Sequence, residues 1–386
     1  MRKAIKKSCA ALLCGALICS AASCGNTTGT ALTVDGRDIR AGIYIFYQMQ
    51  ALSEAASKLT EEQPDLDQSA EGFDFLAQTV EEVPVRDWIK DRTYALCREF
   101  VAVEKKFDEY GLSLTAEETS GINSQANSMW MDENPYAQYF YGVSVIGEYY
   151  EKYGIGKESY RDTYALGIKK DKIFDYLYGE GGSLAVPASE LDAAVTENYA
   201  LVKYFAVNEK ADSAQSYVDA LSGGTAFAEV KKSHDEKVEI AEIEEEMAQA
   251  EADGTEYTGT LPEDVSIELS EESALQTVIS KDSTSPSAEF VTEVFAMSAG
   301  ENKVVTVSST STDSDGQETT TETSYVVAKL DITADSSVME RYRDTELHKM
   351  KDDELEQSFS DAGAAFTVTE NSAAIAKYKI ENVMEE

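Results

Sequence analysis

The chain has 386 residues, of which 42% are hydrophobic, and its formal net charge is −39. This length allows two or three domains, and the apolar content is sufficient for a packed core. Nucleic-acid binding requires a basic surface, so a chain this acidic excludes a nucleic-acid partner. The acidity favours a soluble, self-repelling surface, and it is also compatible with basic or unfolded partners.

The N-terminus predicts export and attachment to a membrane. Its first residues are positively charged, and the apolar run that follows is too short to span a bilayer. The small residues before Cys24 resemble the lipobox of bacterial lipoproteins, in which the cysteine carries the lipid. We therefore expect a signal peptide over 1–23, lipidation at Cys24 and a tether over 24–30. An ordinary cleaved signal peptide with an incidental cysteine is the alternative.

Residues 31–185 predict a helical domain that is entered through one short strand. Alternating residues with Asp35-Gly36 predict a strand or hairpin. Apolar residues between Val85 and Tyr110 recur close to the helical period. Thr115 and Glu118 have the spacing of a capping box. Helices are expected at about 40–59, 85–110, 115–131 and 157–178.

Residues 186–335 predict a mixed helix and strand domain. Leu201–Val207 predicts a strand, and the next helix ends at Gly223-Gly224. A charged helical insert occupies 235–254, and 257–277 is expected to be irregular. The later predicted elements are a short helix at 290–297 and strands at 304–308 and 325–330, joined by a low-complexity loop at 309–322.

Residues 336–386 predict a C-terminal return to the first domain. A charged helix is expected over 337–359, and a strand-like segment over 375–383. The whole chain is therefore predicted to have an α+β fold.

Two sets of landmarks carry a family resemblance. Val34-Asp35-Gly36-Arg37-Asp38-Ile39, leading into a long helix, resembles the opening of SurA and trigger-factor chaperone modules. The segment from about Leu201 to Asp331 resembles the parvulin domain of peptidyl-prolyl isomerases, through LVKYFAV, LSGGTAFAEV, FVTEVFAMSAGE and SYVVAKL in that order. The layout is similar to that of PrsA and SurA foldases. The resemblance implies a helical chaperone domain, a parvulin-like antiparallel-sheet domain and a location on the outer face of a Gram-positive membrane.

The same resemblance indicates candidate catalytic residues. Parvulins keep one histidine in the first strand and one in the last, and these positions hold Tyr204 and Tyr325 here. The phenylalanine that walls the family's proline pocket is kept as Phe290. Rotation about an X–Pro bond has a barrier of about 18–20 kcal/mol, which a parvulin lowers. Either the tyrosine hydroxyls replace the histidines and retain weak isomerase activity, or the rings fill the pocket of an inactive domain.

The sequence lacks the residues that a metal site or a cofactor site would need. His234 and His348 are the only histidines, and His234 is expected in a solvated stretch. Cys97, the one cysteine after Cys24, is expected in the core. We therefore predict no metal site and no cofactor.

These observations predict a lipid-anchored, extracytoplasmic folding factor that binds unfolded or newly exported polypeptides. Its aromatic and methionine side chains in the helical domain would contact varied apolar partners. A chaperone with an inactive parvulin domain, a solute-binding lipoprotein of a transporter and a structural envelope protein are the alternatives. Repeated strand–helix alternation with a parallel sheet would favour the solute-binding lipoprotein, and the helical first half does not show it.

Overall fold

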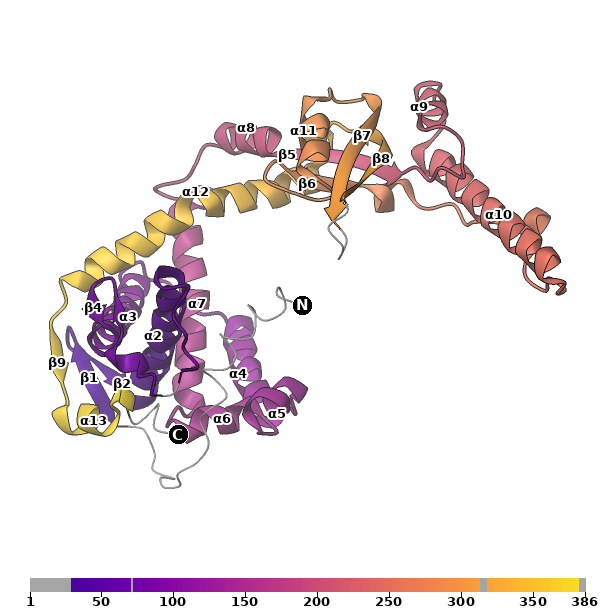
Figure 1. Ribbon diagram of the computed structural model, residues 1–386. Helices are drawn as coiled ribbons and strands as arrows, with labels where there is room; N and C mark the ends of the chain where they lie inside the picture. The colour runs from indigo at the N-terminus through magenta and orange to yellow at the C-terminus, as the bar shows by residue number, and fades with distance from the viewer. Residues whose placement is uncertain (1–28, 71, 313–317, 382–386) are drawn as a thin grey trace. The chain divides into compact units, whose positions relative to one another are not determined.

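The computed structural model describes residues 29–70, 72–312 and 318–381 (Figure 1). These residues form an α+β fold, mostly helical with small antiparallel sheets, as predicted. They divide into two compact units. Unit 1 contains the residues up to Ala185 and those from Met350 onwards, and unit 2 is Val186–Lys349.

Three long helices that pack on one another form the centre of unit 1. They are α2 (Ala41–Glu62), α3 (Val85–Glu109) and α7 (Lys157–Tyr178). Their apolar residues at helical spacing are buried, because this arrangement puts them on one face of each helix. Next along the chain from α3, α4 (Ala116–Met131) packs on α7, and the predicted capping box of Thr115 and Glu118 is present. Two short helices follow it, α5 (Pro135–Tyr141) and α6 (Ile146–Lys152).

Unit 1 also contains a three-stranded antiparallel sheet in the order β2-β1-β9. The strands are β1 (Thr30–Val34), β2 (Arg37–Arg40) and β9 (Val368–Glu370). A small hairpin, β3 (Thr79–Val80) with β4 (Val83–Pro84), and a 3₁₀ turn, η1 (Phe75–Ala77), precede α3. The hairpin that Asp35-Gly36 predicts as one alternative is present as β1 and β2. The expectation of one short entry strand is wrong, because β2 and the C-terminal β9 both pair with β1.

The strand expected at 375–383 is also wrong. Ser372–Lys377 is a helix, α13, and the preceding Asn371 side chain accepts a hydrogen bond from Ala374 N. The alanines favour this helix, and the N-cap satisfies one of its free N–H groups. The strand lies earlier, at β9, where Asn371 Nδ2 also donates to Thr30 O over 2.9 Å.

Unit 2 is built around a four-stranded antiparallel sheet in the order β6-β5-β8-β7. Helix α11 covers one face, and α9 and α10 pack against the other. The alternation of apolar residues in β5 accounts for this, since it supplies a buried set to each face. The strands are β5 (Tyr199–Ala206), β6 (Thr277–Ser280), β7 (Asn302–Thr312) and β8 (Glu318–Lys329). The helices are α8 (Ala188–Asn198), α9 (Ala214–Ser222), α10 (Phe227–Asp253), α11 (Ala288–Ala296) and the first part of α12 (Ser336–Ala364), which continues into unit 1.

The low-complexity loop expected at 309–322 is mostly strand. β7 continues to Thr312 and β8 begins at Glu318. Threonine favours strands, and the hydroxyls of Thr310 and Thr320 lie 3.2 Å apart across the ladder. The segment expected to be irregular contains two 3₁₀ turns, η2 (Pro262–Asp264) and η3 (Glu272–Leu275), and leads into β6, which was not predicted.

Residues 336–349, expected within the C-terminal return, belong to unit 2. The buried carboxylate of Glu346 holds this part of α12 to the start of the sheet. Tyr199 Oη donates to Glu346 Oε1 over 2.8 Å, Asn198 Nδ2 donates to Oε2 over 2.9 Å, and Lys349 Nζ donates to Oε1 over 2.9 Å. Burial raises the pKa of Glu346, but these hydrogen bonds outweigh it and leave the pKa below its usual range.

We predict that Glu346→Gln lowers the free energy of unfolding of unit 2 by about 1–3 kcal/mol at neutral pH, because it weakens charge-assisted hydrogen bonds. The folded-state pKa of Glu346 is depressed, so its contribution is complete above about pH 4.3 and is lost as pH falls further. The difference between wild type and variant should therefore shrink below that pH. Urea unfolding at several pH values measures this effect. Glu340→Gln, on an exposed face of the same helix, is the matched control and should cost almost nothing.

Candidate functional site

The three residues predicted from the parvulin resemblance lie together in unit 2. Tyr204 on β5 faces Val327 on β8, and Tyr325 on β8 faces Ala206 on β5. Both tyrosines therefore lie on the same face of the sheet, the face that α11 covers. The ring centroids of Tyr204 and Phe290 are 5.0 Å apart, those of Phe290 and Tyr325 are 4.9 Å apart, and those of the two tyrosines are 6.0 Å apart.

Phe290 and the two tyrosines differ in burial. Phe290 is fully buried beneath its neighbours, and its backbone N–H is held by the Ser287 N-cap of α11. Tyr204 and Tyr325 are half-buried, and neither hydroxyl has a hydrogen-bond partner in the part of the chain that the structure describes. The three rings thus form an apolar group with two hydroxyls that remain available to a ligand.

His234 is not solvated, which corrects the expectation from sequence. Its side chain is buried in unit 2, and the ring packs against Phe205 and Tyr217. Nε2 accepts a hydrogen bond from Asn208 N over 3.0 Å, and Nδ1 lies 2.9 Å from Asp235 Oδ1. The charged sequence around it concealed that one helical face of α10 packs on the sheet. His234 is thus a core residue with satisfied nitrogens.

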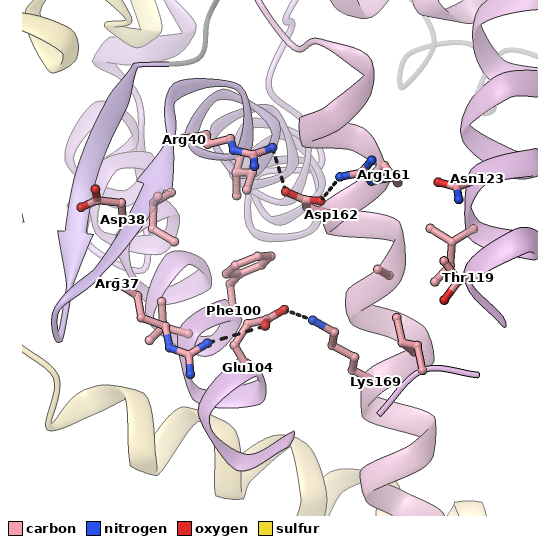
Figure 2. Close-up of a pocket in the computed structure, with 16 residues that line it drawn as sticks. Arg37, Asp38, Arg40, Phe100, Glu104, Thr119, Asn123, Arg161, Asp162 and Lys169 are labelled. Atoms are coloured by element: carbon pink, nitrogen blue, oxygen red, sulfur yellow. Dashed lines mark hydrogen bonds and ion pairs between the residues drawn. The ribbon is translucent and has the colours of Figure 1, made fainter. Parts of the chain in front are cut away.

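Unit 1 contains a charged cavity of about 550 Å³ between β2, α3, α4 and α7 (Figure 2). Asp162 accepts from two arginines, Arg40 at 3.0 Å and Arg161 at 3.2 Å. Glu104 likewise accepts from Lys169 at 2.5 Å and lies 3.7 Å from Arg37.

Sequence analysis did not find this cavity, because its charges come from elements far apart in the chain. Each of the four cations is already paired with a carboxylate. The pairs connect β2 to α3 and α7, so these four cations do not offer free charge to a ligand. Phe100 and other apolar side chains line the rest of the cavity.

A second feature of unit 1 is a connected set of aromatic rings on α4–α6. Its inner end is the contact of Trp130 with Tyr150 and Tyr160, at centroid distances of 6.2 and 5.6 Å. Burial raises the pKa of Tyr150. From there the rings continue through Tyr149 to Tyr141, whose centroids are 4.1 Å apart in a stacked pair.

The outer end of this set is exposed. We call Met131, Tyr136, Tyr139 and Phe140 the aromatic surface. Tyr136 is 73% exposed, Tyr139 is 82% exposed and Phe140 is 47% exposed. Phe140 lies 4.9 Å from Tyr139 and 6.4 Å from Tyr141 between ring centroids, so it joins the surface to the half-buried rings.

Local sequence explains why these residues are exposed. Asn134 caps α5 through its side chain, Pro135 is its first residue, and Gly142 ends it in a left-handed conformation with φ of 65°. A helix of 7 residues has too few turns to bury rings on several sides at once. The Asn-Pro start and the glycine stop around an aromatic run were therefore the signal that could have identified the surface from sequence.

The remaining predictions concern sites for lipid, thiols and metals. Cys24 lies outside the described residues. Cys97 is buried in α3, and burial raises the pKa of its thiol, as expected for a core cysteine. Among residues 29–70, 72–312 and 318–381, no group of three or more His, Cys, Asp or Glu side chains is arranged to hold a metal ion.

Comparisons with known proteins give a weak structural likeness to a foldase. No family model matches the chain, and no curated protein does. A crystal structure of the foldase protein PrsA from Lactococcus lactis is similar over 92% of this chain and 99% of that chain, with 14% sequence identity and a TM-score of 0.30. A TM-score this low does not establish a common arrangement of the two chains.

We predict that Phe290→Ala destabilises unit 2 by about 3–5 kcal/mol, because it leaves a cavity between α11 and the sheet. Tyr204→Phe and Tyr325→Phe should each change stability by less than about 0.5 kcal/mol, since neither hydroxyl has a partner. Urea unfolding monitored by circular dichroism measures all three. A loss of more than about 1 kcal/mol in either Tyr→Phe variant would show that the hydroxyl is bound within the protein.

Proposed function

We propose that the protein is an extracytoplasmic folding factor that binds extended, unfolded segments of exported polypeptides. The observation that carries this proposal is the aromatic surface of unit 1. Large apolar side chains that lie together and exposed are unusual on a soluble surface and are typical of interaction sites. The family resemblance in the sequence supports the same function.

The form of the aromatic surface suits partners of varied sequence. Tyrosine and phenylalanine offer a large contact area with few rotatable bonds, so little entropy is lost on binding. The flexible Met131 side chain, 71% exposed, adapts to different shapes. Half-buried rings behind the surface hold it in place, and the partner need not supply a particular sequence.

The proposed location follows from the N-terminal pattern. A lipid at Cys24 would hold the protein at the outer face of the membrane, where newly exported chains emerge. Across the helices that the structure describes, none combines the length and apolar character needed to cross a bilayer.

A second activity, proline isomerisation, is favoured by the ring group in unit 2. The half-buried rings of Tyr204 and Tyr325, which pack on the buried Phe290, would contact the proline ring, and their hydroxyls would donate hydrogen bonds to the twisted amide. The alternative is that the rings only fill the family pocket and unit 2 binds clients without catalysis. A solute-binding lipoprotein is less compatible with the fold, since the strand pairs in the described residues are antiparallel.

We predict that the protein suppresses the aggregation of a chemically denatured model substrate, and that Tyr136→Ser, Tyr139→Ser and Phe140→Ser together weaken this effect. The ratio of protein to substrate needed for half suppression should rise on the order of threefold or more, because the main contacts are lost. Light scattering during dilution from denaturant measures it.

The matched control replaces three exposed leucines that lie outside the aromatic surface, Leu184, Leu261 and Leu269, by serine. It removes the same number of exposed apolar side chains outside the aromatic surface and should leave suppression unchanged. Equal loss in both variants, or no suppression by the wild-type protein, would contradict the proposed binding function.

For the second activity, we predict that the protein accelerates the proline-limited slow phase of refolding of a model substrate. The double variant Tyr204→Phe, Tyr325→Phe should keep its fold and lose most of the acceleration. The loss of the two hydroxyls is sufficient for this, because a tenfold change in rate corresponds to only about 1.4 kcal/mol of activation free energy. Stopped-flow fluorescence measures the slow phase. A wild-type protein that suppresses aggregation without changing this phase would be a chaperone with an inactive parvulin-like unit.

A further inference from the structure

The aromatic surface lies among carboxylates that have no cationic partner. Between Met129 and Tyr153 the chain has four acidic residues, one lysine and eight aromatic residues. The acidic residues are Asp132, Glu133, Glu148 and Glu151, and all four are exposed. Two accept hydrogen bonds from neutral donors, Asp132 from Ser128 Oγ and Glu151 from Trp130 Nε1, both at 2.6 Å.

Ion pairing in the rest of unit 1 makes this group distinct. Carboxylates elsewhere in unit 1 are often paired, as in Glu54 with Arg92, Glu81 with Lys58 and Glu118 with Lys172. No ion pair within the described ranges involves Asp132, Glu133, Glu148 or Glu151. Within the described part of the chain, the carboxylates beside the exposed rings therefore form no ion pair.

We propose that the aromatic surface selects extended polypeptide segments in which lysine or arginine lies beside apolar residues. This inference rests on the proposed binding of unfolded segments and adds the charge of the partner. Apolar side chains would pack on Tyr136, Tyr139 and Phe140. Neighbouring cations would meet the carboxylates and the faces of the rings, which attract cations.

Charge decides between the occupants that an exposed apolar surface can have. A second copy of this chain would bring the same carboxylates together and would carry the same net charge of −39. A bilayer with anionic lipids would be repelled for the same reason. A cationic, unfolded segment satisfies both the rings and the charges.

The selection should be electrostatic and therefore sensitive to salt. Several exposed ion pairs between the partner's cations and these carboxylates would each contribute modestly. Together they would make a cationic segment bind roughly tenfold more tightly than a neutral one at low ionic strength. At about 0.02 M salt the screening length is roughly 20 Å, and at about 1 M it falls to roughly 3 Å. The preference should be lost at high salt, whereas the contact of apolar side chains with the rings should remain.

The test measures the binding of three labelled peptides to the full chain by fluorescence anisotropy. The peptides share one apolar core and are flanked by lysine, glutamine or glutamate. We expect roughly tenfold tighter binding of the lysine peptide than of the glutamine peptide at low salt, and weaker binding of the glutamate peptide. The variant Asp132→Asn, Glu133→Gln, Glu148→Gln should remove most of this preference and keep the affinity for the glutamine peptide. Glu151 is left unchanged, because it holds Trp130.

The matched control is Glu61→Gln, Glu109→Gln, Glu180→Gln, which changes the net charge equally at exposed positions of unit 1 away from the aromatic surface. It should keep the preference for lysine. Equal affinity for the three peptides, or equal loss in both variants, would overturn the charge selection and leave the binding function intact. Failure of even the glutamine peptide to bind would instead contradict the proposed function itself.

Discussion

The contact between Trp130 and the backbone of α6 is the interaction on which the aromatic surface depends. A Cβ added at Gly147 would lie 2.6 Å from the indole ring, so only glycine allows the ring to reach the helix. With Trp130 in this position, Tyr150 and Tyr160 pack against it, α6 is held to α4, and α5 packs on α6. The exposed rings therefore have a fixed base within unit 1.

This base also explains how exposed apolar side chains remain compatible with a stable fold. The free energy of packing comes from the buried rings, and the outer rings contribute little to it. Tyr136 and Tyr139 can face solvent because Ala137, between them on α5, provides the buried contact. Selection for binding can then act on the outer rings with little effect on stability.

The two units use aromatic residues differently. In unit 1 the rings extend from the core to the surface, and in unit 2 Phe290 is enclosed while two tyrosine hydroxyls stay unbound. The first arrangement suits adaptable contact with many segments, and the second suits orientation of one small group.

Much of the fold could be predicted from local patterns. Periodicity and caps located α3 and α7 to within a residue or so, and the capping box at Thr115 was found from spacing alone. The failures came from tertiary pairing. β9 forms because β1 offers it an edge, β7 and β8 extend because their threonines face one another, and the carboxylate of Glu346 holds part of α12 in unit 2.

The candidate site likewise has features that the sequence predicts and features that depend on tertiary packing. The family pattern predicted that Tyr204, Tyr325 and Phe290 would share a site, and the structure brings their rings together. The burial of His234 could not be predicted, because it depends on how α10 packs against Phe205 on the sheet. The exposure of the rings on α5 depends on the length of that helix, which its Asn-Pro start and glycine stop do encode.

Site-specific photo-crosslinking tests the central claim most directly, because it shows which residue touches an unfolded partner. A benzoylphenylalanine at Tyr139 should crosslink to a permanently unfolded polypeptide and not to its folded counterpart. The same group at Leu184, an exposed position away from α5, should give little product. Equal crosslinking at the two positions, or crosslinking of the folded protein to the same extent, would contradict the assignment of the aromatic surface as the binding site.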